Sequence, residues 1–232
     1  MREKQKIIDF HAHILPCADH GSDGLQTSLE QLALINNAGV SAVVATPHFY
    51  PNFHTVEQFS STVSAAAEEL AGASSERPLI GLGAEVLYCE GIEDMDGLSR
   101  LCIRGTRLLM LELPLADWDK SIIYSVKRLT DSYTVVLAHI DRYMDVCPDV
   151  IDALMSLGAL AQINASALFY TPMRKKLTPY ITNGQIFALG SDLHMADKKS
   201  YAQFEKAKKK LGAEFDSIMA RSEGLLDGAE WM

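Results

Sequence analysis

Histidines and carboxylates recur along this chain just after short apolar segments, where they could share metal ions. His11 and His13 are two residues apart, so on an extended segment both imidazoles point to the same side. Imidazole is the most common side-chain ligand for metals, and carboxylates join it in many sites. Nine residues share this placement: His11, His13, His20, His48, Glu85, Glu112, His139, Asp192 and His194.

The number of such residues favours a metal centre over separate structural roles. A single histidine at the end of a strand is usually a half-buried structural residue, and one His-x-His pair is a weak signal. Nine candidates would require as many independent accidents. His54 is the remaining histidine of the seven, and we interpret it as a loop residue without a site role.

Other catalytic chemistry has less support. The four cysteines, Cys17, Cys89, Cys102 and Cys147, include no Cys-x-x-Cys pair, so neither a zinc knuckle nor a disulfide framework is expected. None of them has the arginine six residues downstream that cysteine-dependent phosphatases need. The chain contains no Gly-Lys-Ser/Thr, the end of a phosphate-binding P-loop.

The elements that must position the nine residues alternate between strand and helix. Short β-branched runs predict strands near residues 7–10, 40–46, 79–84, 107–113, 134–138, 159–163 and 185–190. Helical periodicity predicts helices near residues 28–38, 56–71, 120–131, 148–157, 173–183, 200–211 and 214–222. Two capping boxes, Thr27 to Glu30 and Thr55 to Gln58, mark expected helix starts.

Repeated strand-helix units predict an α/β fold with parallel strands. In such a fold the carboxyl ends of the strands meet on one side, which is where active sites lie. The pattern leaves an open doubly wound sheet and a closed barrel as alternatives. No linker or charge run divides the chain, so we expect a single domain over residues 1–232.

Composition excludes several classes of protein. Thirty acidic and 21 basic residues give a net charge of −9, which argues against nucleic acid as a partner. No apolar run reaches the roughly 18 residues of a membrane span, and the polar residues Asp9, His11 and His13 interrupt any signal-like segment. We therefore expect a cytoplasmic protein with reduced thiols and no membrane insertion.

The order of the motifs resembles a known superfamily. The motifs are Asp9-Phe-His-Ala-His13, Asp19-His20-Gly21, Thr46-Pro-His48, Gly83-Ala-Glu85, Leu111-Glu-Leu-Pro114, Ala138-His-Ile-Asp-Arg-Tyr143 and Ser191-Asp-Leu-His194. Over residues 7–200 they are similar to the polymerase and histidinol phosphatase superfamily, and within it to the bacterial capsule-type manganese-dependent tyrosine phosphatases. The resemblance implies a single metal-dependent phosphatase domain folded as a distorted barrel of seven β/α units.

The resemblance also implies three divalent metal ions, manganese first, with iron or zinc as alternatives. The first ion would be bound by His11, His13, Glu85 and Asp192. The second would share Glu85 and add Glu112 and His139. The third would be bound by His48, His194 and His20.

Three positions depart from the pattern of the tyrosine phosphatases. His20 stands where these enzymes usually have aspartate, as it does in the members that resemble histidinol phosphatases. Ile140 and Asp141 replace the usual proline and glutamate. Lys199 lies near the usual position of a second arginine.

Arg142 and Lys199 are the candidate catalytic residues. Arg142 follows His139 by three residues, so its planar guanidinium is expected to clamp phosphate, whereas Lys199 would act as a point charge. The alternative for Arg142 is a surface residue that pairs with Asp141 or Asp145.

Together these features predict a metal-dependent phosphomonoester hydrolase. The first hypothesis is a phosphatase for phosphotyrosine in proteins, such as the tail of a bacterial tyrosine kinase that regulates capsule or exopolysaccharide synthesis. One alternative is a small-molecule phosphatase similar to the histidinol phosphatases. Another is a metal-binding regulatory domain without catalytic activity. The sequence leaves the oligomeric state open.

Overall fold

Nine short strands form the centre of the part of the chain that the computed structural model describes, residues 6–73, 78–115, 118 and 120–232. They are β1 (Ile8–Ala12), β2 (Ala42–Ala45), β3 (His48–Phe49), β4 (Leu79–Leu82), β5 (Glu85–Leu87), β6 (Leu108–Glu112), β7 (Thr134–Leu137), β8 (Leu160–Asn164) and β9 (Ile186–Gly190). Most of their residues are apolar and buried. Such burial on both faces is typical of parallel strands covered by helices.

All paired strands run parallel. One sheet has the order β1-β2-β4 and the other has the order β3-β5-β6-β7-β8-β9. Only two residues separate β2 from β3, and only two separate β4 from β5. Ala45 pairs with Leu82 before these interruptions and His48 pairs with Glu85 after them, so the register is kept. The seven predicted strands are therefore confirmed as β1, β2, β4, β6, β7, β8 and β9, whereas β3 and β5 lie just beyond the predicted ranges 40–46 and 79–84.

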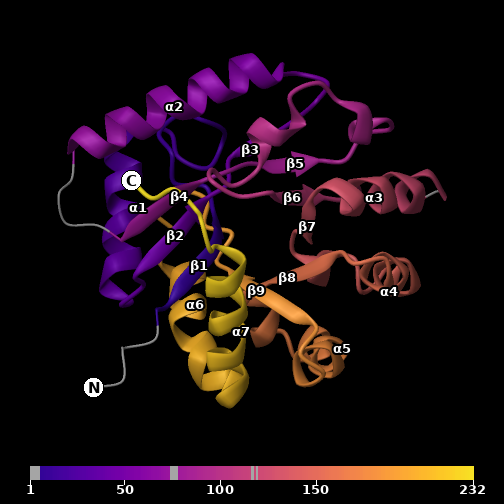
Figure 1. Ribbon diagram of the computed structural model, residues 1–232. Helices are drawn as coiled ribbons and strands as arrows, with labels where there is room; N and C mark the ends of the chain where they lie inside the picture. Colours follow the sequence, from indigo (N-terminus) through magenta and orange to yellow (C-terminus); the bar gives the residue numbers. More distant parts are fainter. Residues whose placement is uncertain (1–5, 74–77, 116–117, 119) are drawn as a thin grey trace.

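Backbone hydrogen bonds also join the two sheets at β1. The N–H of His13 donates to the carbonyl oxygen of Leu193 at 3.0 Å, and the N–H of Asp192 donates to that of His11 at 2.9 Å. These bonds lie beyond the end of β9, so the ladder between the sheets is short. The strands follow one another around a distorted barrel rather than forming an open doubly wound sheet (Figure 1).

Seven helices of the described chain surround the strands (Figure 1). They are α1 (Leu25–Asn37), α2 (Val56–Ala73), α3 (Lys120–Ser132), α4 (Pro148–Ser156), α5 (Thr171–Thr182), α6 (Lys198–Leu211) and α7 (Ala213–Leu225). Each overlaps one of the predicted helical ranges, which confirms the alternation of strand and helix. The last helix, α7, packs against β9 and β1.

The two predicted capping boxes have different outcomes. At α2 the N–H of Gln58 donates to Thr55 Oγ1 at 3.2 Å, and the N–H of Thr55 donates to Gln58 Oε1 at 3.1 Å. This reciprocal box confirms the prediction. The box at Thr27 is wrong, because α1 already begins at Leu25 and the Thr27 hydroxyl donates back to Asp23.

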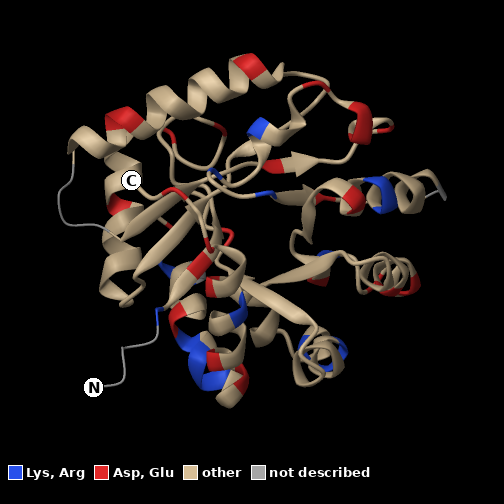
Figure 2. Cartoon of the chain, viewed as in Figure 1, with Lys and Arg blue, Asp and Glu red and all other residues tan. Residues whose placement is uncertain are grey.

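Charged residues are unevenly distributed over the elements. Figure 2 shows Lys and Arg gathered on α6 and acidic residues near the centre of the view, where strands end. The acidic residues at the termini of strands include Glu85, the first residue of β5, and Glu112, the last residue of β6. Among the described helices, none is both long enough and apolar enough to span a membrane.

Tyr143 fixes the backbone beside the end of β6, and we expect Tyr143→Phe to destabilise the fold. Its hydroxyl accepts the N–H of Leu113 at 3.0 Å and donates to the Leu113 carbonyl oxygen at 2.8 Å. Loss of the hydroxyl leaves both buried groups without these bonds, which should lower the free energy of unfolding by about 1–3 kcal/mol. Urea unfolding with a metal chelator present measures this, and Tyr124→Phe, at a residue 61% exposed, is the control. Equal unfolding midpoints for the two variants would contradict the prediction.

Candidate metal centre

The parallel strands deliver the predicted ligands to one end of the barrel. Their positions are His11 on β1, His13 just after it, His48 at the start of β3, Glu85 at the start of β5, Glu112 at the end of β6, His139 two residues after β7, and Asp192 and His194 after β9. His20 lies in the loop between β1 and α1. β3 follows β2 after two residues, and β5 follows β4 in the same way. His48 and Glu85 therefore also lie just beyond the carboxyl ends of β2 and β4.

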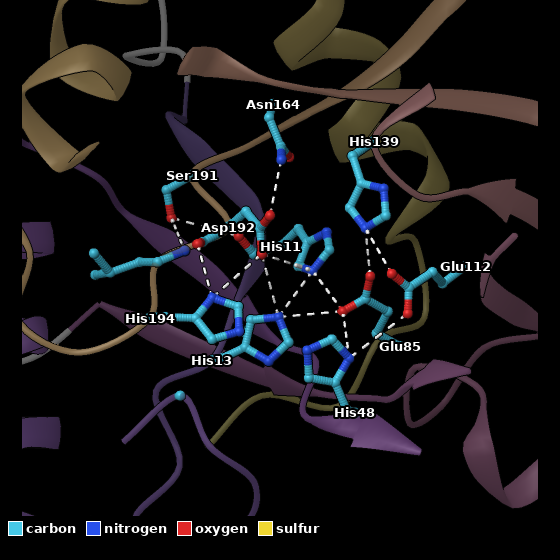
Figure 3. Close-up of polar contacts among 12 residues, drawn as sticks. His11, His13, His48, Glu85, Glu112, His139, Asn164, Ser191, Asp192 and His194 are labelled. Atoms are coloured by element: carbon cyan, nitrogen blue, oxygen red, sulfur yellow. Dashed lines mark hydrogen bonds and ion pairs between the residues drawn. The ribbon is translucent and has the colours of Figure 1, made fainter. Parts of the chain in front are cut away.

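Glu85 is the centre of the cluster (Figure 3). Its Oε2 lies 3.2 Å from Nε2 of His11, 3.2 Å from Nε2 of His13 and 3.1 Å from Nδ1 of His48. Its Oε1 lies 2.6 Å from Nε2 of His139. The Glu85 side chain is fully buried. One carboxylate thus touches four imidazoles, which come from β1 and the residues after it, from β3 and from the loop after β7.

Eight of the nine predicted ligands fall into four groups whose possible ligand atoms all lie within 4.8 Å of one another. The groups are His11, His13 and Asp192; His11, Glu85 and His139; His48, Glu85 and Glu112; and His13, His48 and His194. The groups share members, so they form one continuous cluster. Its size and composition suit more than one divalent ion.

The structure places the remaining predicted residues less centrally. His20 is exposed, and its ring stacks between His48 at 4.7 Å and His194 at 4.9 Å between centroids. In the described structure His13, not His20, completes a group with His48 and His194. Lys199 is exposed in the first turn of α6, and its role stays a prediction. His54 lies in a loop, as expected.

Arg142 reaches across the cluster from η3 (Ile140–Arg142). Its Nη1 lies 3.2 Å from Glu112 Oε1, and its Nη2 lies 2.6 Å from Asp192 Oδ2. The alternative pairing with Asp141 or Asp145 is wrong. Asp141 accepts the N–H of Asn164 at 2.9 Å, and Asp145 pairs with Lys176.

Two residues of the cluster have backbone conformations that are uncommon for side chains with a Cβ. His139 has φ 31° and Asp192 has φ 53°, both in the left-handed region. Such conformations cost free energy and persist where surrounding contacts impose them, often at functional sites. Here the N–H of His139 donates to Gln162 Oε1 at 2.5 Å, and Asn164 Nδ2 donates to Asp192 Oδ2 at 2.8 Å.

The electrostatics of the cluster favour positive charge at its centre. Burial opposes a charge on His13, but the nearby carboxylates of Asp19, Asp192 and Glu85 outweigh it and raise the pKa of His13 well above its usual value. Burial opposes ionisation of Glu85 as well, yet His11 and the other imidazoles hold its pKa well below the usual range. A divalent cation at this position would experience the same attraction.

Other groups in the cluster shift in the opposite direction. Burial lowers the pKa of His48 to about 3, so its imidazole is neutral, the form that binds metal. Burial, together with the neighbouring charge of Glu85, raises the pKa of Glu112. Burial and the carboxylates of Glu112 and Glu85 raise the pKa of Tyr50 to about 12, and its ring stacks on that of His48. Tyr50 is thus at the edge of the site.

Comparison with known proteins assigns this arrangement to a family. The profile described as "Capsular polysaccharide synthesis, CpsB/CapC" matches residues 7–222. The chain belongs to the CpsB/CapC family. A curated relative, the tyrosine-protein phosphatase YwqE of Bacillus subtilis, is 24% identical over 235 residues, which cover 95% of this chain and 91% of the relative.

Two solved structures support the same fold for this CpsB/CapC protein. One is from a study of YwqE from Bacillus subtilis and CpsB from Streptococcus pneumoniae, described as metal-dependent tyrosine phosphatases; the TM-score is 0.78 at 21% identity, over 97% of this chain and 96% of that one. The other is a histidinol phosphate phosphatase from Lactococcus lactis with zinc, L-histidinol and phosphate, with a TM-score of 0.59 at 13% identity over 89% and 94% of the two chains. The resemblance to the capsule-type family seen in the motifs is confirmed by the CpsB/CapC match, and both solved structures share its fold.

Two glycines of this CpsB/CapC protein allow backbone to approach the ligands closely. A Cβ at Gly21 would lie 2.1 Å from the Cβ of His13. A Cβ at Gly190 would lie 2.6 Å from the Cβ of His11 and 2.7 Å from Nε2 of Gln162. A larger residue at either position would displace a predicted ligand.

Sequence reasoning missed the residues that orient the ligands. Asp19 Oδ2 lies 2.6 Å from His13 Nδ1 and accepts the N–H of His48 at 2.8 Å, while its Oδ1 accepts the N–H of Gly21 at 2.8 Å. Gln162 Oε1 lies 3.5 Å from Nδ1 of His11. Asp19 belongs to the motif Asp19-His20-Gly21, and an acidic residue near a His-x-His pair is a signal for such a role, since metal-binding histidines are usually oriented by a carboxylate.

We expect Asp19→Asn to weaken metal binding by about ten- to a hundredfold, the usual effect of losing such an orienting partner. The amide removes the negative charge that holds His13 Nδ1, although it keeps the size of the side chain. Competition with a chromophoric chelator measures the dissociation constant. Asp23→Asn, at an exposed residue of the same loop, is the control and should bind metal as the parent does. A metal dissociation constant in Asp19→Asn equal to that of the parent would show that Asp19 does not support metal binding by orienting His13.

Proposed function

We propose that this chain is a metal-dependent phosphatase that hydrolyses phosphotyrosine in proteins. The observation that carries the proposal is the cluster of eight imidazole and carboxylate side chains that includes Glu85 at its centre, with Arg142 in contact with two of its carboxylates. Membership of the CpsB/CapC family and homology to a tyrosine-protein phosphatase support the substrate class. The family description further suggests a phosphorylated protein of capsular polysaccharide synthesis, such as a tyrosine kinase tail, as the partner.

The residues fit bound divalent ions. His48 Nδ1, His139 Nδ1 and Asp192 Oδ1 are buried atoms without a hydrogen-bond partner among the described residues. Two of them, His48 Nδ1 and Asp192 Oδ1, belong to the ligand groups and lie near other possible ligand atoms. Buried polar atoms rarely lack partners, and metal coordination would satisfy these two. The site therefore suits a cation chemically as well as electrostatically.

We infer three ions, with manganese ahead of iron and zinc. Histidine-rich ligation favours these metals over magnesium, which prefers oxygen ligands. His11, His13 and Asp192 would hold the first ion, Glu85, His139 and Glu112 the second, and His48 and His194 the third, with His20 close to the third set. When bound, such ions polarise phosphoryl oxygens and lower the pKa of water.

The protein side chains supply position and charge. Arg142 offers two N–H groups in a plane, which matches two oxygens of a phosphoryl group. It contacts Glu112 and Asp192, and both carboxylates also contact imidazoles of the cluster, so it can hold the phosphate against the cluster. The guanidinium of Arg142 donates to Glu112 and Asp192, which orient it. Asn164 in turn donates to Asp192 and orients that carboxylate. No protein nucleophile is needed.

The function is tested by turnover of a panel of phosphoesters with the metal content of the same preparation determined. A phosphotyrosine peptide, phosphoserine and histidinol phosphate are compared with manganese, iron, zinc or cobalt added. We expect the phosphotyrosine peptide to have the highest kcat/KM, activity to be lost with chelator and restored by metal, and Cys17→Ser to keep most of the activity. Cys17 is an exposed loop residue whose thiol donates to the Asp23 carbonyl oxygen at 3.3 Å.

Each other outcome points to a different protein. Preferred turnover of the small alkyl phosphates would indicate a metabolite phosphatase. Absence of turnover with every metal, in a protein that binds metal, would indicate a regulatory domain. Inactivation by alkylation that is abolished in Cys17→Ser would indicate thiol chemistry.

A further inference from the structure

Two aromatic side chains extend the site outward from His48. The ring of Tyr50 stacks on that of His48, with 5.1 Å between centroids and 15° between planes. The ring of Phe53 stands nearly perpendicular to Tyr50, at 6.4 Å and 85°. The two rings therefore form a corner of aromatic surface that begins at a predicted metal ligand.

A turn after β3 holds this corner in place. The N–H of Phe53 donates to the Tyr50 carbonyl oxygen at 2.9 Å, and the N–H of His54 donates to the same oxygen at 3.1 Å. The turn leaves Phe53 80% exposed, more than any other large apolar side chain among the described residues. Tyr50 is half-buried. An exposed phenylalanine alone is ordinary, but here it adjoins a second ring that contacts the metal cluster.

The order of groups along this path matches the chemistry of an aryl phosphate. From the inside outward the path has Glu85, then the imidazole of His48 at 3.1 Å, then the phenol of Tyr50, then the phenyl of Phe53. A phosphotyrosine side chain has a dianion at one end, an aromatic ring next and an apolar methylene after it. Aromatic rings pack favourably edge-to-face and offset, whereas an alkyl phosphate offers no ring to this surface.

We propose that Tyr50 and Phe53 form the subsite that binds the aryl ring of the substrate and so determine selectivity for aryl over alkyl phosphates. This inference rests on the proposed phosphatase function and adds the residues that select the substrate. Both are specificity residues, because they contact the leaving group rather than the reacting phosphoryl group.

The test compares kcat/KM for phosphotyrosine and phosphoserine in the parent and in Phe53→Ala. We expect kcat/KM for phosphotyrosine to fall by about tenfold, chiefly through KM, because burial of apolar surface is lost. The value for phosphoserine should change less than about twofold, since no ring contact is removed. Phe53→Leu should lie between parent and alanine variant, and Tyr50→Leu should also lower the aryl to alkyl ratio.

Two controls separate this inference from the proposed function. Tyr170→Ala replaces an aromatic residue that is 61% exposed on the segment after β8, and it should leave the ratio unchanged. Calorimetric binding of phenylphosphonate and methylphosphonate measures the ring contact without turnover, and Phe53→Ala should weaken only the aryl compound. Metal content must equal that of the parent in each variant.

An unchanged aryl to alkyl ratio in Phe53→Ala, with an active parent enzyme, would overturn the inference and leave the phosphatase function standing. Equal loss on both substrates with reduced metal content would also overturn it, because the residues would then only support His48. An inactive parent that still binds phenylphosphonate through Phe53 would overturn the proposed function and keep the subsite.

Discussion

Replacing Glu85 with glutamine is expected to lower bound metal and to reduce kcat/KM on a phosphotyrosine peptide by more than about a hundredfold. Partners that only orient metal ligands already contribute about ten- to a hundredfold, so loss of a direct ligand should exceed that range. Glu85 touches His11, His13, His48 and His139, and all these contacts lie between 2.6 and 3.2 Å. Glutamine keeps the shape of the side chain but removes the charge that attracts cations into the buried cluster.

Elemental analysis after dialysis and steady-state kinetics on the same sample measure both effects. Glu93→Gln is a matched control, because the Glu93 side chain is only 6% exposed and pairs with Arg128 at 3.3 Å, outside the ligand groups. That variant should keep parent metal content and rate. Full metal occupancy together with parent kinetics in Glu85→Gln would show that the cluster does not bind metal through Glu85.

Replacing Arg142 with alanine is expected to reduce kcat/KM by about ten- to a hundredfold without releasing metal. A charge-assisted bidentate contact to phosphate contributes roughly 1.5–3 kcal/mol, which corresponds to this range. Arg142 is placed for such a contact, because its side chain is 37% exposed and its guanidinium contacts both Glu112 and Asp192. Lysine keeps the charge and loses the planar pair of donors, so Arg142→Lys should fall between alanine and the parent.

The appropriate control is another arginine that pairs with carboxylates outside the site. Arg128 contacts Asp94 through both Nη atoms at 2.7 and 2.5 Å, and Arg128→Ala should leave kinetics unchanged because exposed pairs contribute little. Parent-like kcat/KM in Arg142→Ala would remove Arg142 from phosphate binding. Loss of metal in that variant would instead indicate that Arg142 supports the ligands.

The order of elements and most ligands could be predicted from the sequence. Apolar runs separated by helical periodicity are local signals, and each of the seven predicted strands and helices depends mainly on residues near it in the chain. Parallel topology then requires that strand ends meet, which is why residues as distant as His11 and Asp192 are expected at one centre. The motif order added the resemblance to the capsule-type family, which the CpsB/CapC match bears out.

Local sequence signals did not locate the start of α1 or the interruptions of the strands. The box at Thr27 has the right residue types, but the helix starts at Leu25 because the preceding loop enters it there. The predicted ranges 40–46 and 79–84 cover β2 and β4 but end before β3 and β5, which resume the pairing after two-residue interruptions. They matter nonetheless, since they set His48 and Glu85 opposite each other.

The sequence by itself thus determined the alternation of elements and the set of residues that could bind metal. Only the tertiary structure decided that Glu85 is the common contact, that His13 rather than His20 groups with His48 and His194, and that Asp19 orients His13. It also decided that Arg142 pairs with Glu112 and Asp192 and not with its neighbours in the chain. The physical reason is that these choices depend on side-chain directions and backbone angles fixed by long-range packing, such as the left-handed φ of His139 and Asp192.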